Sequence, residues 1–408
     1  MKKKELRAYA RLIARTGAAV QSGQEVLIYA SLDQIRFVEW LTEECYLAGA
    51  RKVIVEWSHD ALTLLHTRYQ SAEELCRHED WELSRLAHIR DELSVHIYLE
   101  SSGPDALAGI DQEKYNRSVQ AWRAIRKPYR DVMDGRYQWC IAAVPGREWA
   151  RRVFPGCKTK KAVKKLWKAI LSASRAIGDS EKNWQEHDAA LKARCDWLNS
   201  LQLRSLHYTA DNGTDLTVGL IPGCRFNGGS DTTPAGVTFE ANIPSEECFT
   251  SPRAGEAEGI VYATKPLSYQ GQLIEDFSLR FEGGRAVEAH AAKNEELLRS
   301  ILEMDENAAR LGEAALIPVE SPISRSGLLF YSTLFDENAS CHLALGDGFD
   351  ECVPGFENMS HQQLCDMGIN DSLIHVDFMI GCESMCIDGV TESGETVAIF
   401  RRGSWAEG

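Results

Sequence analysis

Two histidines and several carboxylates stand beside apolar segments in the second half of this 408-residue chain. His375 and Asp377 are two residues apart in the apolar stretch SLIHVDFMI, and His342 enters another apolar run. Because successive side chains of a strand point to opposite faces, His375 and Asp377 share one face, and the alternate residues Ile374, Val376, Phe378 and Ile380 line the other. Imidazole and carboxylate groups placed together in this way could hold a metal ion.

Three glutamates could complete such a site. Glu246 and Glu247 are adjacent after a proline turn, and Glu313 stands at the entry to an apolar run. Taken one by one, each histidine could be a satisfied core residue, and each glutamate a cap or a solvated end. An unpaired buried charge is costly, however, and a shared cation would satisfy all of these groups together. Imidazole with carboxylate suits zinc, manganese, cobalt or iron better than calcium.

The charges of the candidate site are compatible with two divalent ions. Three carboxylates and two neutral imidazoles leave one positive charge on such a pair, and a bridging hydroxide would neutralise it. A pair of ions lowers the pKa of bound water and holds both the attacking and the leaving oxygen of a hydrolysis. The spacing therefore permits hydrolytic metal chemistry, although the ligands are far apart in the sequence.

The segments around these residues predict an α+β region rich in antiparallel strands. From about residue 203, short alternating runs are separated by glycine-rich turns, which is typical of antiparallel strands. Helical spacing over residues 294–311 predicts one inserted helix. The strands expected most clearly are Arg204 to Thr209, Asp215 to Leu220, Gly259 to Ala263, Glu275 to Phe281 and Val397 to Arg402.

The first half of the chain has the pattern of an α/β domain. Strand-like runs alternate with helical spacing, which favours a mostly parallel sheet. Neither a G-x-G-x-x-G nor a P-loop pattern occurs in its turns, so we expect no nucleotide-binding loop. We place the domain boundary near residue 190, giving an N-terminal domain over 1–190 and a catalytic domain over 191–408. The expected N-terminal strands are Glu25 to Tyr29, Lys52 to Glu56, Ser94 to Leu99 and Trp139 to Val144.

Charge and cysteine content restrict the partners and the compartment. The formal net charge of −15 disfavours nucleic acid and anionic membrane, which both need a positive field. The basic stretch 158–168 has helical spacing and is either a solvated helix face or a contact surface for an acidic partner or subunit. The N-terminus lacks the apolar core of a signal peptide, so the twelve cysteines are expected to be reduced in a cytoplasmic protein.

The segment around His342 resembles a known family. The string LFDENASCHLALG, residues 334–346, is similar to the signature of the thermophilic-type metalloaminopeptidases, the family of aminopeptidases T, S and PepS. The resemblance covers essentially the whole chain, in order. It extends through Gly23-Gln-Glu-Val, Trp139-Cys-Ile-Ala-Ala-Val-Pro, Trp149-Ala-Arg-Arg-Val-Phe, Asn212-Gly-Thr-Asp-Leu, Asn242-Ile-Pro-Ser-Glu-Glu, Ser321-Pro-Ile and His375-Val-Asp-Phe-Met-Ile-Gly.

The resemblance implies an exopeptidase that removes the N-terminal residue of short peptides, using hydroxide bound by two divalent ions. The ions would be zinc, cobalt, manganese or magnesium, and the protein would be a homodimer whose N-terminal domain shapes the dimer and access to the site. The family's metal ligands match five residues of this chain, namely Glu247, Glu313, His342, His375 and Asp377.

Two further positions bear on catalysis. The family has a tyrosine seven residues after its first ligand histidine, where this chain has Phe349. If that hydroxyl stabilises the tetrahedral intermediate, its loss lowers turnover by about 10²- to 10³-fold; a realigned loop or another hydroxyl, such as that of Tyr331, is the alternative. Glu246 could relay a proton to the leaving nitrogen, or it could be a solvated neighbour of Glu247.

Two other functions remain open at this stage. His342, His375 and Asp377 have the composition of a mononuclear iron site, and some ring-cleaving pyridinediol dioxygenases resemble this family. The presence of Glu247 and Glu313 favours the two-metal hydrolase instead. A non-catalytic member of the family is the third possibility, but the presence of all five ligands argues against it.

Overall fold

The computed structural model describes residues 2–270 and 272–406. The chain forms two compact units, the first made of residues up to 184 together with 230–244, and the second of 185–229 together with the chain from 245 onward. Helix α9 (Ser180–Ser200) carries the chain from the first unit into the second. The division into domains 1–190 and 191–408 remains a prediction, and no sequence signal marked the return of 230–244 to the first unit.

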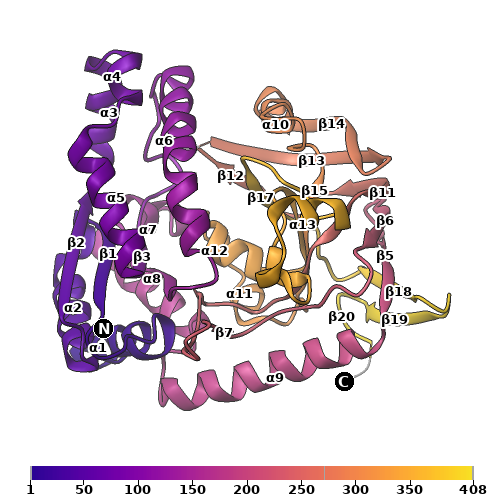
Figure 1. Cartoon of the computed structure of the whole chain (residues 1–408), viewed down its shortest axis with the longest axis horizontal. Helices are drawn as coiled ribbons and strands as arrows, with labels where there is room; N and C mark the ends of the chain where they lie inside the picture. Colours follow the sequence, from indigo (N-terminus) through magenta and orange to yellow (C-terminus); the bar gives the residue numbers. More distant parts are fainter. Residues whose placement is uncertain (1, 271, 407–408) are drawn as a thin grey trace. The chain divides into compact units, whose positions relative to one another are not determined.

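The first unit contains a five-stranded sheet in the order β2-β1-β3-β4-β9, and all its pairs are parallel. Figure 1 labels β2, β1 and β3 of this sheet. Strand β1, which lies between β2 and β3, is an apolar run whose side chains from Val26 to Ile28 are fully buried, as expected for a parallel sheet covered on both faces. The predicted α/β class is confirmed. The strands are β1 (Glu25–Ser31), β2 (Lys52–Ser58), β3 (Val95–Glu100), β4 (Trp139–Ala143) and β9 (Asn242–Ile243).

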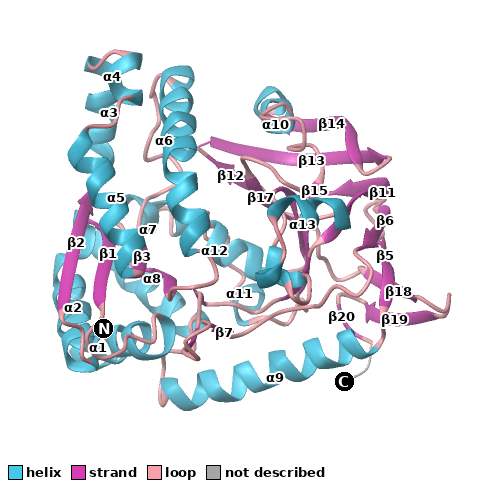
Figure 2. Ribbon diagram, viewed as in Figure 1, coloured by secondary structure: helices cyan, strands magenta, loops and turns pink. Residues whose placement is uncertain are grey.

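Helices connect the strands of this sheet (Figure 2). A short hairpin of β7 (Asp231–Thr232) and β8 (Thr238–Phe239) also belongs to the first unit. The helical elements are α1 (Lys3–Leu12), the π-helix η1 (Ile13–Gly17), η2 (Leu32–Gln34), α2 (Ile35–Ala48), α3 (Asp60–Tyr69), α4 (Ala72–Cys76), α5 (Asp80–Glu92), α6 (Gln112–Met133), α7 (Arg147–Val153) and α8 (Thr159–Ala173).

The second unit contains a large antiparallel sheet in the order β12-β13-β11-β6-β5-β18-β19-β20, with β14 paired to β13. The expected antiparallel character of this half is therefore confirmed. The strands are β5 (Leu203–Thr209), β6 (Asp215–Leu220), β11 (Pro252–Tyr262), β12 (Leu267–Tyr269), β13 (Gln272–Glu282), β14 (Arg285–Lys293), β18 (Cys386–Thr391), β19 (Thr396–Arg401) and β20 (Ser404–Trp405).

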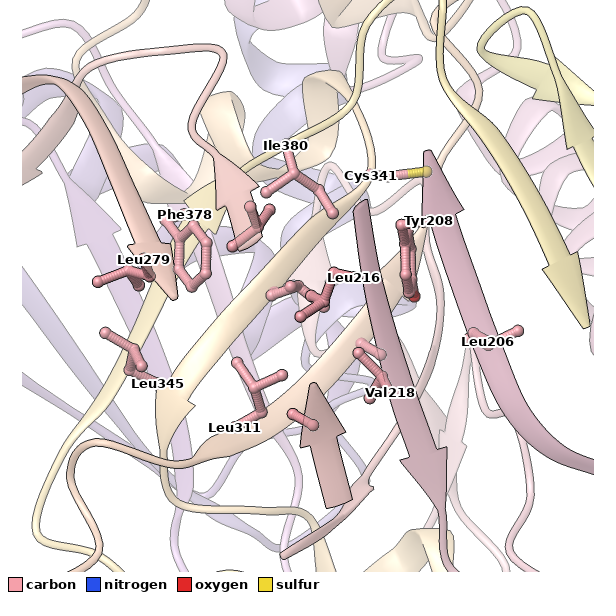
Figure 3. Close-up of a cluster of buried hydrophobic side chains, with 14 of the residues drawn as sticks. Leu206, Tyr208, Leu216, Val218, Leu279, Leu311, Cys341, Leu345, Phe378 and Ile380 are labelled. Carbon is pink, nitrogen blue, oxygen red and sulfur yellow. The ribbon is translucent and has the colours of Figure 1, made fainter. Parts of the chain in front are cut away.

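A smaller antiparallel sheet of the second unit positions the candidate site. Its order is β10-β15-β16-β17, with bounds β10 (Cys248–Thr250), β15 (Leu311–Leu316), β16 (His342–Gly346) and β17 (His375–Met379). One face of this sheet packs into an apolar core that it shares with the large sheet. Figure 3 shows Leu345 and Phe378 in this cluster together with Leu216 of the large sheet. The core fixes which face of the small sheet is left for polar side chains.

Short helical elements complete the second unit. They are α10 (Glu295–Leu302), α11 (Pro322–Arg325), α12 (Thr333–Asp336), η3 (Glu337–Ala339), η4 (Asp350–Cys352), η5 (Phe356–Asn358) and α13 (His361–Met367). The helix predicted over 294–311 is wrong in its second half, because α10 ends at Leu302. The chain then turns, with the Asp305 carboxylate accepting a hydrogen bond from the Asn307 backbone at 2.8 Å, and Leu311 begins a strand.

A helix that crosses a bilayer must be long and apolar. Within residues 2–270 and 272–406, no helix combines the length and the apolar character that such a crossing needs.

Replacing Gly346 at the end of β16 by alanine should destabilise the protein. Gly346 has a φ of +98°, and a Cβ atom there would lie 2.1 Å from the Ile374 carbonyl oxygen. A positive φ strains an alanine at either position by about 1 to 3 kcal/mol, but only Gly346→Ala adds this clash, so its urea midpoint should fall further than that of Gly355→Ala. Gly355→Ala is the control, because its φ is +82° but no atom lies within 4 Å of the added carbon. Equal midpoints for the two variants would contradict this reading.

Candidate metal centre

The small sheet brings Glu313 and Asp377, two of the predicted ligand residues, into one row across three strands. Glu313 on β15 pairs with Ala344 on β16, and Ala344 pairs with Asp377 on β17. Residues that pair across strands point to the same face, so the two carboxylates flank an alanine. The small side chain of Ala344 leaves room between them, while the neighbouring Leu343 and Leu345 point into the core.

His342 and His375 lie on the same face by the alternation of their strands. His342 is two residues from Ala344, and His375 is two residues from Asp377, as the pattern of SLIHVDFMI predicts. Glu247 immediately precedes β10, which pairs with β15. The structure therefore brings all five predicted ligand residues together from four neighbouring segments of one sheet.

The five residues form two groups that share Glu313. Glu247, Glu313 and His342 form one group, and Glu313, His375 and Asp377 form the other, with the ligand atoms of each within 4.8 Å of one another. Glu313 Oε1 lies 3.8 Å from His342 Nε2, and Glu313 Oε2 lies 3.1 Å from His375 Nε2. The two oxygens of one carboxylate thus face different histidines.

The remaining carboxylates each lie close to one histidine. Glu247 Oε2 is 3.4 Å from His342 Nε2, and Asp377 Oδ1 is 3.2 Å from His375 Nε2. Each group therefore consists of one imidazole, one carboxylate of its own and one oxygen of Glu313. This is a donor set that suits zinc or another transition metal.

Backbone carbonyl groups fix the orientation of both imidazoles. His342 Nδ1–H donates to the Glu337 carbonyl oxygen at 3.0 Å, and His375 Nδ1–H donates to the Asp347 carbonyl oxygen at 2.8 Å. Because Nδ1 carries the proton in each ring, Nε2 is directed at the carboxylates. Metal-binding histidines in proteins are held in the same way.

Burial makes the charges in the cluster strongly interdependent. Glu313 and His342 are 3% and 1% exposed. Burial and the nearby Glu313 carboxylate raise the pKa of Glu247 to about 8. Burial alone would lower the pKa of His342, but the Glu313 carboxylate raises this pKa to about 9. Burial alone would raise the pKa of Glu313, but hydrogen bonds with both histidines hold it well below its usual range.

The pKa of His375 is raised for the same reason. Burial alone would lower this pKa, but the Asp377 and Glu313 carboxylates raise it well above its ordinary value. Without a cation, protons on the imidazoles and on Glu247 therefore balance the carboxylates.

One buried carboxylate oxygen in the cluster also indicates that these donors fit divalent ions. Asp377 Oδ1 is buried and has no hydrogen-bond partner of suitable geometry in the described part of the chain. A buried acceptor of this kind is normally satisfied. A cation placed between Asp377, His375 and Glu313 would satisfy it.

Phe349 lies beside the second group. Its ring centroid is 4.9 Å from that of His375 and 5.0 Å from that of Phe249, which stands on β10. The Ser251 hydroxyl accepts a hydrogen bond from the Phe349 backbone N–H at 2.7 Å. The residue at the family's tyrosine position therefore borders the site and presents an apolar ring there.

Glu246 points toward a different neighbour from Glu247. Its carboxylate Oε2 lies 4.0 Å from His187 Nε2, and its backbone N–H donates to the Asn338 side chain at 2.7 Å. Adjacent residues on extended backbone face opposite ways, which accounts for the difference. The proton-transfer role of Glu246 remains a prediction.

Comparison with known proteins agrees with the motifs and the geometry. The family described as thermophilic metalloprotease (M29) matches residues 2–405. The chain belongs to this family. It is 39% identical to aminopeptidase AmpS of Bacillus subtilis and 38% identical to aminopeptidase T of Thermus thermophilus, each over 98% or more of both chains. The expected class, a metalloaminopeptidase, is confirmed over the dioxygenase alternative.

Solved structures of this M29 protein's relatives confirm its fold. Wild-type AmpT from Thermus thermophilus matches with a TM-score of 0.91 and 37% identity over 99% of both chains. A 2,5-dihydroxypyridine dioxygenase from Pseudomonas putida matches with a TM-score of 0.50 and 14% identity over 99% of this chain and 96% of that one. The dioxygenase shares the fold alone, so it gives no support to ring-cleaving activity.

Several groups that support the candidate ligand residues of this M29 protein were not predicted from the sequence. The carbonyl groups of Glu337 and Asp347 orient the histidines, and no side-chain pattern reveals a carbonyl group. Asn338 and Ser251 support neighbouring segments. Asn338 lies within the motif LFDENASCHLALG, so its position in that motif was the one available signal.

The metal-free protein should lose stability as the pH rises through about 9. His342 has a folded pKa of about 9 against an ordinary 6.5, so its contribution is fully present below pH 6.5 and is lost above 9. Glu247, raised to about 8, acts in the same direction. Since metal ligands must be deprotonated, the increase in Tm on adding zinc should grow over the same range. Calorimetry of chelated and reloaded protein measures both, and a pH-independent Tm without metal would contradict the account.

Proposed function

We propose that this chain is an aminopeptidase with two divalent ions, bound by Glu247, Glu313, His342, His375 and Asp377. The observation that carries the proposal is the position of Glu313, whose two oxygens each lie near a different histidine. A carboxylate placed in this way can bridge two ions. His342 with Glu247, and His375 with Asp377, would complete the protein ligands of the two ions.

When bound, the two ions would polarise the scissile carbonyl and acidify the attacking water. Zinc, cobalt and manganese suit the nitrogen and oxygen donors, and magnesium is a weaker fit because it prefers oxygen. The five ligand side chains would hold the ions, and the carbonyl groups of Glu337 and Asp347 would keep the imidazole Nε2 atoms available.

The rings of Phe249 and Phe349 would form an apolar border beside the second group. Such a border lowers the local dielectric and strengthens the interactions of charges inside the site. It also leaves the developing oxyanion without the hydroxyl that the family resemblance implies at position 349. Glu246 would carry a proton to the leaving nitrogen, a role supported only by its place next to Glu247.

The family resemblance supports the remaining proposals. Short peptides with a free N-terminus would be the substrates, and the protein would be a homodimer in which the N-terminal domain restricts access to the site. All twelve cysteines lie in the described ranges and are free thiols. This supports a reducing compartment, and we propose the cytoplasm.

Replacing Glu313 by glutamine should remove both metals, whereas replacing His375 by alanine should mainly affect one. Wild-type protein reloaded after chelation should hold two ions per chain by elemental analysis and should hydrolyse leucyl anilide. Glu313→Gln should lose at least about 10²-fold in turnover, because it removes a ligand of both ions.

His207→Ala is the matched control for these variants. His207 pairs with Asp215 at 2.7 Å on the large sheet, outside the cluster, so its loss should leave metal content and turnover unchanged. Full activity in both Glu313→Gln and His375→Ala would refute the assignment. One iron per chain with oxygen uptake would instead support the oxygenase chemistry.

Restoring a hydroxyl at position 349 should raise turnover. Phe349→Tyr would add a hydrogen-bond donor beside His375, and one such donor contributes about 10²- to 10³-fold to kcat. Phe356→Tyr is the control, because Phe356 packs in a separate small cluster of the same unit. Unchanged kcat in Phe349→Tyr would show that another group supplies the hydroxyl or that none is needed.

A further inference from the structure

A buried asparagine lies behind each of the two histidines. Asn338 is 0% exposed and Asn370 is 2% exposed. Neither belongs to the ligand groups, and each donates its side-chain amide to backbone carbonyl groups near a histidine. Buried polar side chains of this kind cost free energy unless they are hydrogen-bonded, so their contacts show what they hold in place.

Asn338 joins the two segments that carry the first group. Its Oδ1 accepts a hydrogen bond from the Glu246 backbone N–H at 2.7 Å, and Glu246 is adjacent to the proposed ligand Glu247. Its Nδ2 donates to the Leu334 carbonyl at 3.0 Å and thereby closes the turn that contains Glu337. The Glu337 carbonyl in turn accepts from His342 Nδ1. Asn338 therefore fixes the backbone beside both Glu247 and His342.

Asn370 holds the loop that supports the second group. Its Nδ2 donates to the Gly346 carbonyl at 2.6 Å and to the Asn307 carbonyl at 3.1 Å. The backbone carbonyl of Asn370 accepts the Gly348 N–H at 2.8 Å. These contacts fasten the loop on both sides of Asp347, whose carbonyl accepts from His375 Nδ1.

We propose that Asn338 and Asn370 are positioning residues, each setting the affinity of one of the two metal sites through one histidine. Asn338 would act on the ion held by Glu247, Glu313 and His342. Asn370 would act on the ion held by Glu313, His375 and Asp377. This proposal rests on the two-metal function, and it adds that the two sites are tuned separately by the backbone behind them.

The amide group suits these positions because it donates to carbonyl oxygens, and in Asn338 also accepts, without carrying a charge. An aspartate has the same shape but places an oxygen against the carbonyl oxygens that Nδ2 contacts, so the carbonyl behind the histidine should shift. Losing an outer partner of a metal-binding histidine costs about 10- to 100-fold in metal affinity. The two variants should therefore weaken different sites, whereas general destabilisation would weaken both.

The test is a metal titration of the full chain with Asn338→Asp and Asn370→Asp. Cadmium NMR would follow the two bound ions, with the signals assigned by His342→Ala and His375→Ala. We expect Asn338→Asp to lower affinity about 10- to 100-fold at the signal that His342→Ala abolishes, and Asn370→Asp to do so at the other. Asn199→Asp is the control, because Asn199 contacts the backbone N–H and carbonyl of Phe226 in the same unit.

The outcomes separate this proposal from the function on which it rests. A wild-type chain with fewer than two cadmium signals would refute the two-metal function. Two wild-type signals with affinities unchanged in both variants, or weakened equally at both sites, would refute the positioning roles. If an aspartate variant does not fold by circular dichroism, the smaller Asn338→Ser or Asn370→Ser variant replaces it in the same titration.

Discussion

The architecture of the site depends on one buried carboxylate, that of Glu313, which lies close to two histidines. Glu313 is buried in the middle of the small sheet, and its oxygens lie 3.8 Å from His342 Nε2 and 3.1 Å from His375 Nε2. A buried charge needs compensation, and the free energy of the folded protein depends on how the cluster obtains it. Protons serve this purpose in the metal-free chain, which is why the pKa of His342 is raised. Divalent ions would serve it in the loaded enzyme.

The rest of the second unit keeps this charge where it can be compensated. Alternation along β16 and β17 buries Leu345 and Phe378 against the large sheet (Figure 3). It therefore presents the candidate ligand residues on the opposite face. A slip of one residue in the register would exchange the two faces. The apolar core therefore stabilises the fold and also determines the composition of the site.

The family resemblance implied the full set of five clustered residues. The sequence itself predicted, from the regular alternation of a strand, that His375 and Asp377 share a face. It also predicted the parallel sheet, because its strands are apolar runs between helices. It overestimated the helix after residue 294, since helical spacing continues through 303–310 although the chain turns there. The carbonyl groups of Glu337 and Asp347 could not be predicted, because every residue has a carbonyl and only the fold selects which one meets a histidine.

The claim that Glu313 joins two metal sites is tested most directly by anomalous diffraction from crystals of the zinc- or manganese-loaded enzyme. The account predicts two peaks, one beside His342 and Glu247 and one beside His375 and Asp377, with one Glu313 oxygen facing each. A single peak at full loading, or two peaks with Glu313 bound to neither, would contradict it.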